Sequence, residues 1–181
     1  MLLSSAICVS AEQSPAREIT ITSVEEFLAF TDNCRLDSYS QGLNVKLTAE
    51  IDLTGQSFAG IPIFCGIFDG NGHYISGLYS TVAITAIGGN NSKFGGFMCR
   101  LGGTAKNLVI KNSTFAPCED ISTFGGVGAI TGYPVRCKIQ NCRVENITLK
   151  SINDGGQLGG IAGYGNGNNS TIKNCVSINV T

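Results

Sequence analysis

Hydrolysis of a glycosidic bond requires two carboxyl groups on one surface, so the acidic residues are the first candidates for chemistry. The candidates are Asp52, Asp69, Glu119, Asp120, Glu145 and Asp154. They stand at unrelated positions relative to the repeats described below, and we expect no coil to present two of them on one face. The sequence therefore predicts no catalytic carboxylate pair.

His73 is the only histidine of the chain. One imidazole cannot build a two-histidine zinc site, and no serine or cysteine nucleophile motif flanks it. We therefore interpret His73 as a structural or exposed residue rather than as a general base.

The segment Asp69-Gly70-Asn71-Gly72 could offer carboxylate and carbonyl oxygens to Ca²⁺. Its single carboxylate falls short of the roughly six to eight oxygen ligands that calcium takes. A tight turn with its glycines at positive φ explains the same residues. We therefore predict no catalytic residue, no cofactor site and no metal site.

The eight cysteines include no CxxC pair, which argues against a zinc knuckle and against a thioredoxin-type site. Seven of them follow residue 11, and an odd number argues against a fully paired disulfide framework. Cys142 and Cys175 recur in the repeats and could form a bridge or bind a metal. Packing as small apolar residues explains them without a further assumption.

The composition is typical of one all-β domain. The chain has 181 residues, of which 24 are glycine and only 14% are charged, whereas an average globular chain carries about 25% charged residues. The formal net charge of -1 gives no long-range attraction to phosphates or to anionic membranes. We therefore expect neither a nucleic-acid partner nor membrane insertion.

Residues 1–11 are interpreted as a partial signal peptide. Met1 to Val9 is apolar, and the stretch ends in Val9-Ser10-Ala11, with small residues at the two places that a signal peptidase reads. A positively charged region is missing, so a short core strand is the alternative interpretation. The first interpretation predicts an exported protein.

Ser23-Val24-Glu25-Glu26 has the spacing of a capping box, and it predicts a short helix over residues 23–33. After Gly42 the apolar residues alternate with polar ones up to Leu53, which predicts strands. From there on we expect strands only.

Three copies of one pattern come next, each an apolar-Gly-Gly-apolar motif, a turn, and a polar residue before asparagine. The first halves are Phe94-Gly95-Gly96-Phe97, Phe124-Gly125-Gly126-Val127 and Leu158-Gly159-Gly160-Ile161, and the asparagines are Asn107, Asn141 and Asn174. Their residue numbers differ by 34 and then by 33, and each is followed at the fifth position by another asparagine: Asn112, Asn146 and Asn179. A β repeat of this length predicts a parallel β-helix, because stacked turns bury an apolar face that one turn cannot.

In such a stack, equivalent residues form ladders along the axis. We expect Leu108, Cys142 and Cys175 to form one ladder, and Asn141 and Asn174 to stack inside. When the second and third repeats are aligned on their asparagines, Val144 is matched with Ser177. When one residue after Cys175 is left out of this alignment, Val144 is matched with Val176 instead. We therefore expect a bulge in one turn.

The run Phe64-Cys65-Gly66-Ile67-Phe68-Asp69-Gly70-Asn71-Gly72-His73-Tyr74-Ile75-Ser76-Gly77-Leu78, followed by the three repeats, resembles the GLUG-motif proteins. These are β-helical regions of bacterial surface proteins, including adhesins and the stalks of IgA-specific metallopeptidases. The resemblance covers about residues 19–181 and implies a right-handed helix. The peptidase activity of that family belongs to a separate domain, and its His-Glu-x-x-His motif is absent here.

We therefore expect a cap helix and first strands over 19–65, and β-helix repeats over 66–181 that are truncated at the C-terminus. The predicted function is that of an exported, non-catalytic bacterial surface scaffold that binds a surface glycan or a protein ligand. A polysaccharide lyase or hydrolase on the same fold is one alternative, and the non-catalytic stalk of a larger surface peptidase is another. An uncapped last coil also predicts end-to-end self-association of the chain.

Overall fold

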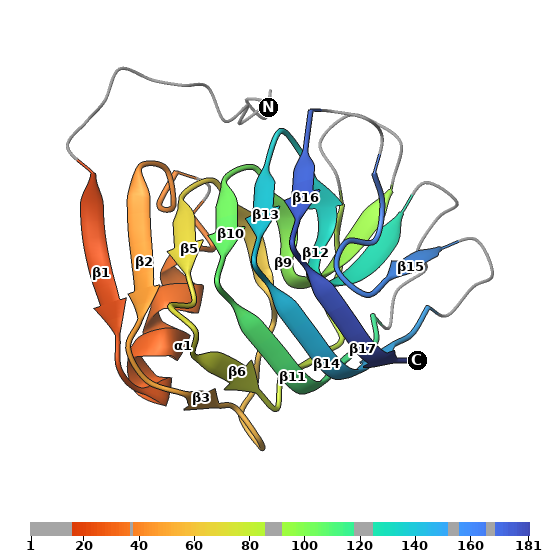
Figure 1. The fold of residues 1–181 in the computed structure, drawn as a ribbon, viewed down its shortest axis with the longest axis horizontal. Helices are drawn as coiled ribbons and strands as arrows, with labels where there is room; N and C mark the ends of the chain where they lie inside the picture. Colours follow the sequence, from red (N-terminus) through yellow and green to blue (C-terminus); the bar gives the residue numbers. More distant parts are fainter. Residues whose placement is uncertain (1–15, 37, 86–91, 118–124, 152–155, 166–168) are drawn as a thin grey trace.

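The computed structural model describes residues 16–36, 38–85, 92–117, 125–151, 156–165 and 169–181. Its strands form three sheets around one axis (Figure 1). The first sheet contains β1 (Arg17–Ile21), β2 (Leu43–Leu47), β5 (Ile67–Asp69), β10 (Thr104–Lys106), β13 (Lys138–Gln140) and β16 (Thr171–Lys173). The second contains β3 (Ile51–Asp52), β6 (Tyr74–Ser76), β7 (Tyr79–Ser80), β11 (Val109–Phe115), β14 (Arg143–Leu149) and β17 (Val176–Val180). The third contains β4 (Ile61–Phe64), β8 (Ile84–Thr85), β9 (Lys93–Leu101), β12 (Gly126–Pro134) and β15 (Gln157–Gly159).

The chain passes through the first, second and third sheets in turn and then returns to the first. For example, β10, β11 and β12 form one coil, and β13, β14 and β15 form the next. The axis runs from left to right in Figure 1, and the coil is right-handed. The described strands of successive coils pair in parallel, and β8 runs antiparallel to its neighbour β9. The predicted right-handed parallel β-helix is confirmed.

The repeat length read from the asparagines is the length of a coil. Lys106 pairs with Gln140 and Gln140 pairs with Lys173, so the spacing of strand partners equals that of the asparagines. Val144 pairs with Ser177, so the register that keeps the asparagines aligned is correct. The irregularity lies elsewhere, between β9 and β12, where the register shifts between Gly128 and Thr131. The expected bulge in one turn is therefore present, and it lies in the third sheet.

Inward-facing side chains stack in rows that run along the axis. Val45, Phe68, Ala105 and Ile139 are successive partners in the first sheet, and each is at most 1% exposed. Alternate residues of each strand point to opposite faces, so every coil adds one residue to such a row. The rows together form the continuous core that the solenoid requires.

The helix α1 (Val24–Asn33) closes the N-terminal end of this core and confirms the predicted capping helix. Ser23 is its N-cap and accepts a hydrogen bond from Glu26 N at 3.3 Å, while Glu26 Oε2 accepts one from Thr22 N at 2.7 Å. Its buried rings join a cluster whose contacting centroids lie 5.4 to 6.3 Å apart: Phe27, Phe30, Phe58, Phe64, Phe68 and Phe97. The helix therefore stabilises the first coils through apolar packing as well as through its cap.

The glycine pairs of the repeats line the third sheet, where neighbouring coils approach closely. A Cβ atom on Gly96 would lie 2.2 Å from Gly128 O, and one on Gly126 would lie 2.8 Å from Tyr164 N. These contacts are to backbone atoms, which cannot move aside as a flexible side chain can. Only glycine fits at these points of the repeat.

The repeated asparagines form two ladders at corners of the coil. Asn141 Nδ2 donates to Asn107 Oδ1 and Asn174 Nδ2 donates to Asn141 Oδ1, both at 3.3 Å. The second ladder joins Asn112, Asn146 and Asn179 at 3.0 and 3.1 Å. The expected stacking of the asparagines is confirmed. The expectation that Asn141 and Asn174 lie inside the coil is wrong, because both are exposed.

The backbone explains why asparagine occupies these corners. All six residues have φ between 49° and 54°, in the left-handed region that asparagine tolerates better than other residues with a Cβ atom. The residue after each first-ladder asparagine turns inward: Leu108 and Cys142 are at most 1% exposed, and Cys175 is half-buried. The Leu108, Cys142 and Cys175 ladder is thus confirmed, and the asparagine is the bend that precedes it.

Candidate functional site

Two of the candidate carboxylates share one row on the outer face of the second sheet. Asp52 pairs with Ser76, Ser76 with Lys111, and Lys111 with Glu145. Our expectation of unrelated positions was therefore wrong for Asp52 and Glu145. Three strand spacings of about 4.8 Å place them about 14 Å apart, which exceeds the roughly 5 to 9.5 Å between the carboxyl groups of glycosidases. Glu119, Asp120 and Asp154 lie outside the described residues.

The charges in this row are already engaged by their neighbours. Asp52 Oδ1 accepts hydrogen bonds from Thr54 N at 3.1 Å, Thr54 Oγ1 at 2.7 Å and Ser76 Oγ at 3.2 Å. The bonds from Thr54 lower the pKa of Asp52, with smaller contributions from Ser76 and Lys111. Glu145 Oε2 pairs with the guanidinium of Arg143 at 2.9 Å.

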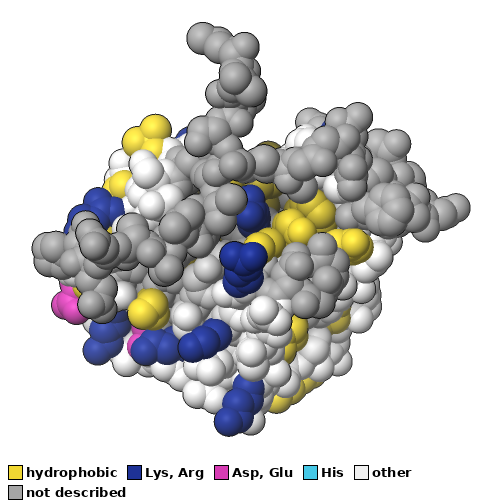
Figure 2. Space-filling view, turned by 90° about the horizontal axis from the view of Figure 1, so that it is seen from above, with side chains coloured by type: hydrophobic (Ala, Val, Ile, Leu, Met, Phe, Trp, Pro, Cys, Tyr) yellow, Lys and Arg dark blue, Asp and Glu magenta, His cyan; other side chains and the backbone are white. Residues whose placement is uncertain are grey.

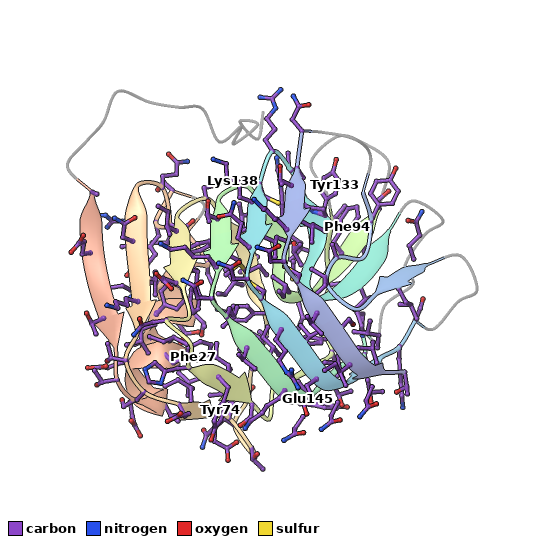
Figure 3. All side chains as sticks on the ribbon, viewed as in Figure 1. Phe27, Tyr74, Phe94, Tyr133, Lys138 and Glu145 are labelled. Atoms are coloured by element: carbon purple, nitrogen blue, oxygen red, sulfur yellow. The ribbon has the colours of Figure 1, made fainter. Side chains whose placement is uncertain are left out.

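The cation of the row packs on an aromatic ring. Lys111 Nζ lies 3.3 Å from the centroid of the Tyr74 ring, and Figure 3 shows Tyr74 and Glu145 at the lower edge of the sheet. With its charges paired in this way, the row forms a polar outer surface. It does not bring a nucleophile and a base together.

Asp69 is held as a turn residue rather than as a calcium ligand. Its Oδ1 accepts from Asn71 N at 2.9 Å and from Asn107 Nδ2 at 3.0 Å, and Oδ2 lies 3.1 Å from Lys106 Nζ. Partial burial raises the pKa of Asp69, but the bonds from Asn107 and Asn71 and the charge of Lys106 outweigh it and lower the pKa overall. These donors occupy the oxygens that a cation would need.

The turn that follows has the expected shape with one correction. Gly72 has a φ of 83°, as predicted, but the second left-handed residue is Asn71, at 52°, and not Gly70. Gly70 serves a different purpose, because a Cβ atom there would lie 2.5 Å from Asn107 O in the next coil. His73, which comes next, lies 3.7 Å from Glu50 through its Nδ1 and is partly exposed.

The described cysteines divide into one bonded residue and several thiols. Cys65 is disulfide-bonded, whereas Cys34, Cys99, Cys137, Cys142 and Cys175 are free. Burial raises the pKa of the Cys142 thiol to about 12, with a smaller contribution from Cys175 beside it. Cys142 and Cys175 are therefore ladder residues and not a disulfide. In the described ranges, no three His, Cys, Asp or Glu residues meet in a way that could hold a metal ion.

Three aromatic rings form a stack along the third sheet that sequence reasoning missed. The Phe94 and Tyr133 centroids lie 4.5 Å apart with the rings 14° from parallel, and the Tyr164 ring lies 5.9 Å from both. Phe94 is buried at 2% exposure, while Tyr133 and Tyr164 are half-buried. The stack therefore offers part of two tyrosine rings to the surface, supported from below by a phenylalanine.

Arg100 lies beside this stack. It pairs with Tyr133 across β9 and β12, so the two side chains share the outer face of the sheet. Its Nε is buried and has no hydrogen-bond partner in the part of the chain that the structure describes. An unpaired buried donor of this kind costs about 1 to 3 kcal/mol. We call Phe94, Arg100, Tyr133 and Tyr164 the aromatic surface.

The aromatic surface belongs to the upper side of the molecule. Figure 3 shows Phe94, Tyr133 and the exposed Lys138 near the upper end of the ribbon. Figure 2, seen from above, shows hydrophobic side chains gathered beside Lys and Arg side chains on that side. The chemistry available there is that of ring faces next to cationic hydrogen-bond donors.

No protein-family model, curated protein or solved structure matches this chain. The one helix of the described residues is too short and too polar to cross a membrane. The function must therefore be inferred from the arrangement of the residues themselves.

Proposed function

We propose that this chain is an exported, non-catalytic β-helix scaffold of a bacterial surface, and that it binds a glycan at the aromatic surface. The observation that carries the proposal is the stack of Phe94, Tyr133 and Tyr164 beside Arg100. The apolar N-terminal stretch and the resemblance to GLUG-motif regions support export and a surface location.

The side chains favour an acidic sugar as the ligand. A tyrosine ring offers a flat apolar face with a polar tip, and this combination suits a sugar, which has an apolar face and a rim of hydroxyl groups. A carboxylate on the sugar would accept charge-assisted hydrogen bonds from the guanidinium of Arg100, which is half-buried. A chain of such sugars could lie along the solenoid axis, because Phe94, Tyr133 and Tyr164 come from successive coils.

Binding to an array of neutral and acidic glycans, followed by titration with the best ligand, tests the proposal. We expect an acidic glycan to bind, and the double variant Tyr133→Ala, Tyr164→Ala to weaken it by about tenfold or more, which is about 1.4 kcal/mol. Tyr79→Ala is the matched control, because Tyr79 is 59% exposed but lies on the second sheet.

Three results would count against this function. The first is the absence of any glycan ligand, with a protein as the bound partner instead. The second is an equal loss of binding in Tyr79→Ala. The third is cleavage of the bound polysaccharide, which would favour the lyase or hydrolase alternative.

A further inference from the structure

The small net charge of the chain conceals a separation of charge along the solenoid axis. Residues 1–92 contain three basic and nine acidic residues, whereas residues 93–181, which begin with β9, contain nine basic and four acidic ones. The Asp and Glu side chains visible in Figure 2 lie toward its left side, and Lys and Arg side chains continue to its middle. The later coils are therefore the basic half of the molecule, although the net charge of -1 alone predicts no attraction to anions.

Part of this positive charge lies on the outer face of the first sheet. Lys106 pairs with Gln140 and Gln140 pairs with Lys173, so the three side chains form one outward row. Lys138 begins β13 two residues before Gln140 and therefore lies in the neighbouring outward row. One strand spacing and two residues along a strand separate it from each of the other two lysines, which places their Cα atoms about 8 Å apart. The three lysines thus zigzag across three successive coils.

Few anions neutralise these cations. Lys106 Nζ lies 3.1 Å from Asp69 Oδ2, but Lys138, Lys173 and Arg136 form no ion pair with any carboxylate of the described residues. All three of these side chains are exposed. Like charges on neighbouring strands repel each other, and an anion bound between them would remove that repulsion. We call Lys106, Arg136, Lys138 and Lys173 the basic strip.

The basic strip and the aromatic surface run side by side along the axis, one on each side of a corner of the coil. Tyr133 lies near the end of β12 in the third sheet, and Lys138 begins β13 in the first sheet. Four residues, including Arg136, form the corner between them, and Figure 3 shows Tyr133 and Lys138 near the upper end of the ribbon. Both surfaces are lateral, and an outward position in a strand stays on the outer face whatever pairs with the strand edge. One extended ligand can therefore contact both surfaces.

We propose that this ligand is a linear polyanionic polysaccharide, whose acidic groups bind the basic strip while its sugar rings pack on the aromatic surface. The inference rests on the proposed glycan function and extends its site onto the first sheet. Neutral polar groups lie among the cations of that sheet, because Thr104, Gln140 and Thr171 occupy the same outward rows. Their hydroxyl and amide groups can donate hydrogen bonds to sugar hydroxyls and accept hydrogen bonds from them.

The density of charge favours a polysaccharide over a nucleic acid. Duplex DNA carries one negative charge per about 1.7 Å of its axis. The basic strip offers Arg136, Lys138 and Lys173, over strands that span about 10 Å, and the acidic residues of the earlier coils would repel the rest of a long duplex. A polysaccharide with one acidic group on each sugar, or on every second sugar, has fewer charges per length and suits this spacing better.

Titration calorimetry with heparin, polygalacturonate and hyaluronate, at several salt concentrations, tests the proposal. We expect at least one of these polymers to bind, and the neutral polymer dextran to bind at least about tenfold more weakly. The variant Lys138→Gln, Lys173→Gln should weaken the binding of the best polymer by about tenfold or more. It should also make the slope of log affinity against log salt concentration shallower by about one to two, because each lysine that contacts an anion releases bound counterions.

The matched control is the variant Lys46→Gln, Lys150→Gln, which removes the same charge elsewhere. Both of its lysines are exposed, and Lys46 lies in β2 of an early coil while Lys150 follows β14 of the second sheet. The control should keep the affinity and the salt dependence of the unaltered chain. Both variants should keep its circular dichroism spectrum.

Four results would overturn the proposal: no affinity for any of the three acidic polymers, equal affinity for dextran, tighter binding of DNA than of the best polymer at the same salt concentration, or equal losses in the two lysine variants. Its failure can be told apart from failure of the proposed function. If Tyr133→Ala, Tyr164→Ala weakens glycan binding but Lys138→Gln, Lys173→Gln does not, the basic strip is wrong and the aromatic surface stands. If no glycan binds, neutral or acidic, the proposed function fails as well.

Discussion

Replacing Asn141 tests whether the corner asparagines act through the backbone or through their side chains. Asn141 has a φ of 54° and takes part in two amide hydrogen bonds, to Asn107 and from Asn174. Alanine removes both bonds and places a less tolerant residue in the left-handed region. Glycine removes the same bonds but adopts this conformation without strain.

The structure gives an expected size for each effect. The left-handed conformation costs an ordinary residue roughly 1 to 2 kcal/mol, and two exposed hydrogen bonds contribute about 0.5 kcal/mol each. Asn141→Ala should therefore lower the free energy of unfolding by about 2 to 3 kcal/mol. Glycine avoids the strain but loses about 0.4 to 1 kcal/mol through the greater freedom of the unfolded chain. We expect Asn141→Gly to be the more stable of the two variants by about 1 kcal/mol.

Urea unfolding followed by circular dichroism measures both variants. Asn33→Ala serves as a control, because Asn33 is an exposed residue at the end of α1 without a positive φ, and it should change stability by less than about 0.5 kcal/mol. If glycine destabilises as much as alanine does, the positive φ is not the reason for asparagine at this corner. If both changes fall within the range of the control, the ladder itself contributes nothing to stability.

The burial and charge of single residues set three further expected outcomes. Ile139→Ala should lower the free energy of unfolding, measured in urea, by about 2 to 5 kcal/mol. Ile172 lies in the same row but is 50% exposed, so Ile172→Ala should lower it clearly less. Equal losses in the two variants would contradict the exposure of Ile172 in the last described coil. Cys175 should react with a thiol reagent well before Cys142, because burial raises the pKa of the Cys142 thiol to about 12. Peptide mapping that finds the reverse order of reaction would contradict the ladder. The lowered pKa of Asp69 stabilises the fold at pH values above 3.8, the usual pKa of the group, and this contribution is lost as the pH falls through the lower pKa of the folded state. Asp69→Asn should therefore flatten the acid side of the plot of stability against pH. A plot parallel to that of the wild type would contradict the contacts assigned to Asp69.

The period of the repeat could be read from the sequence, but its geometry at the corners could not. A regular spacing aligns asparagines whether they point inward or outward, so the ladder was predicted and its exposure was not. What decides between the two is the positive φ of the asparagines. That angle turns the chain so that the following residue, such as Cys142, points into the core.

The sites that sequence reasoning missed are those that do not follow the period. Asp52 and its strand partner Ser76 are separated by fewer residues along the chain than strand partners of the later coils. The repeat period therefore did not indicate the row that Asp52 shares with Glu145. Tyr133 meets Phe94 although the two residues are not strand partners, and their spacing along the chain matches no multiple of the repeat. Local irregularities in an otherwise regular fold therefore created the candidate site.

The order of the coils along the chain has a consequence for synthesis and export. The capping helix and the phenylalanine cluster lie within residues 24–97, and each later coil pairs its strands with the coil before it. A polypeptide that leaves a ribosome or a translocation pore with its N-terminus first therefore presents its largest apolar cluster before the later coils emerge. Each new coil then meets strand edges that are already formed, and it needs only local contacts to join them. Assembly in this direction keeps the exposed apolar surface at any moment to about one cross-section of the solenoid.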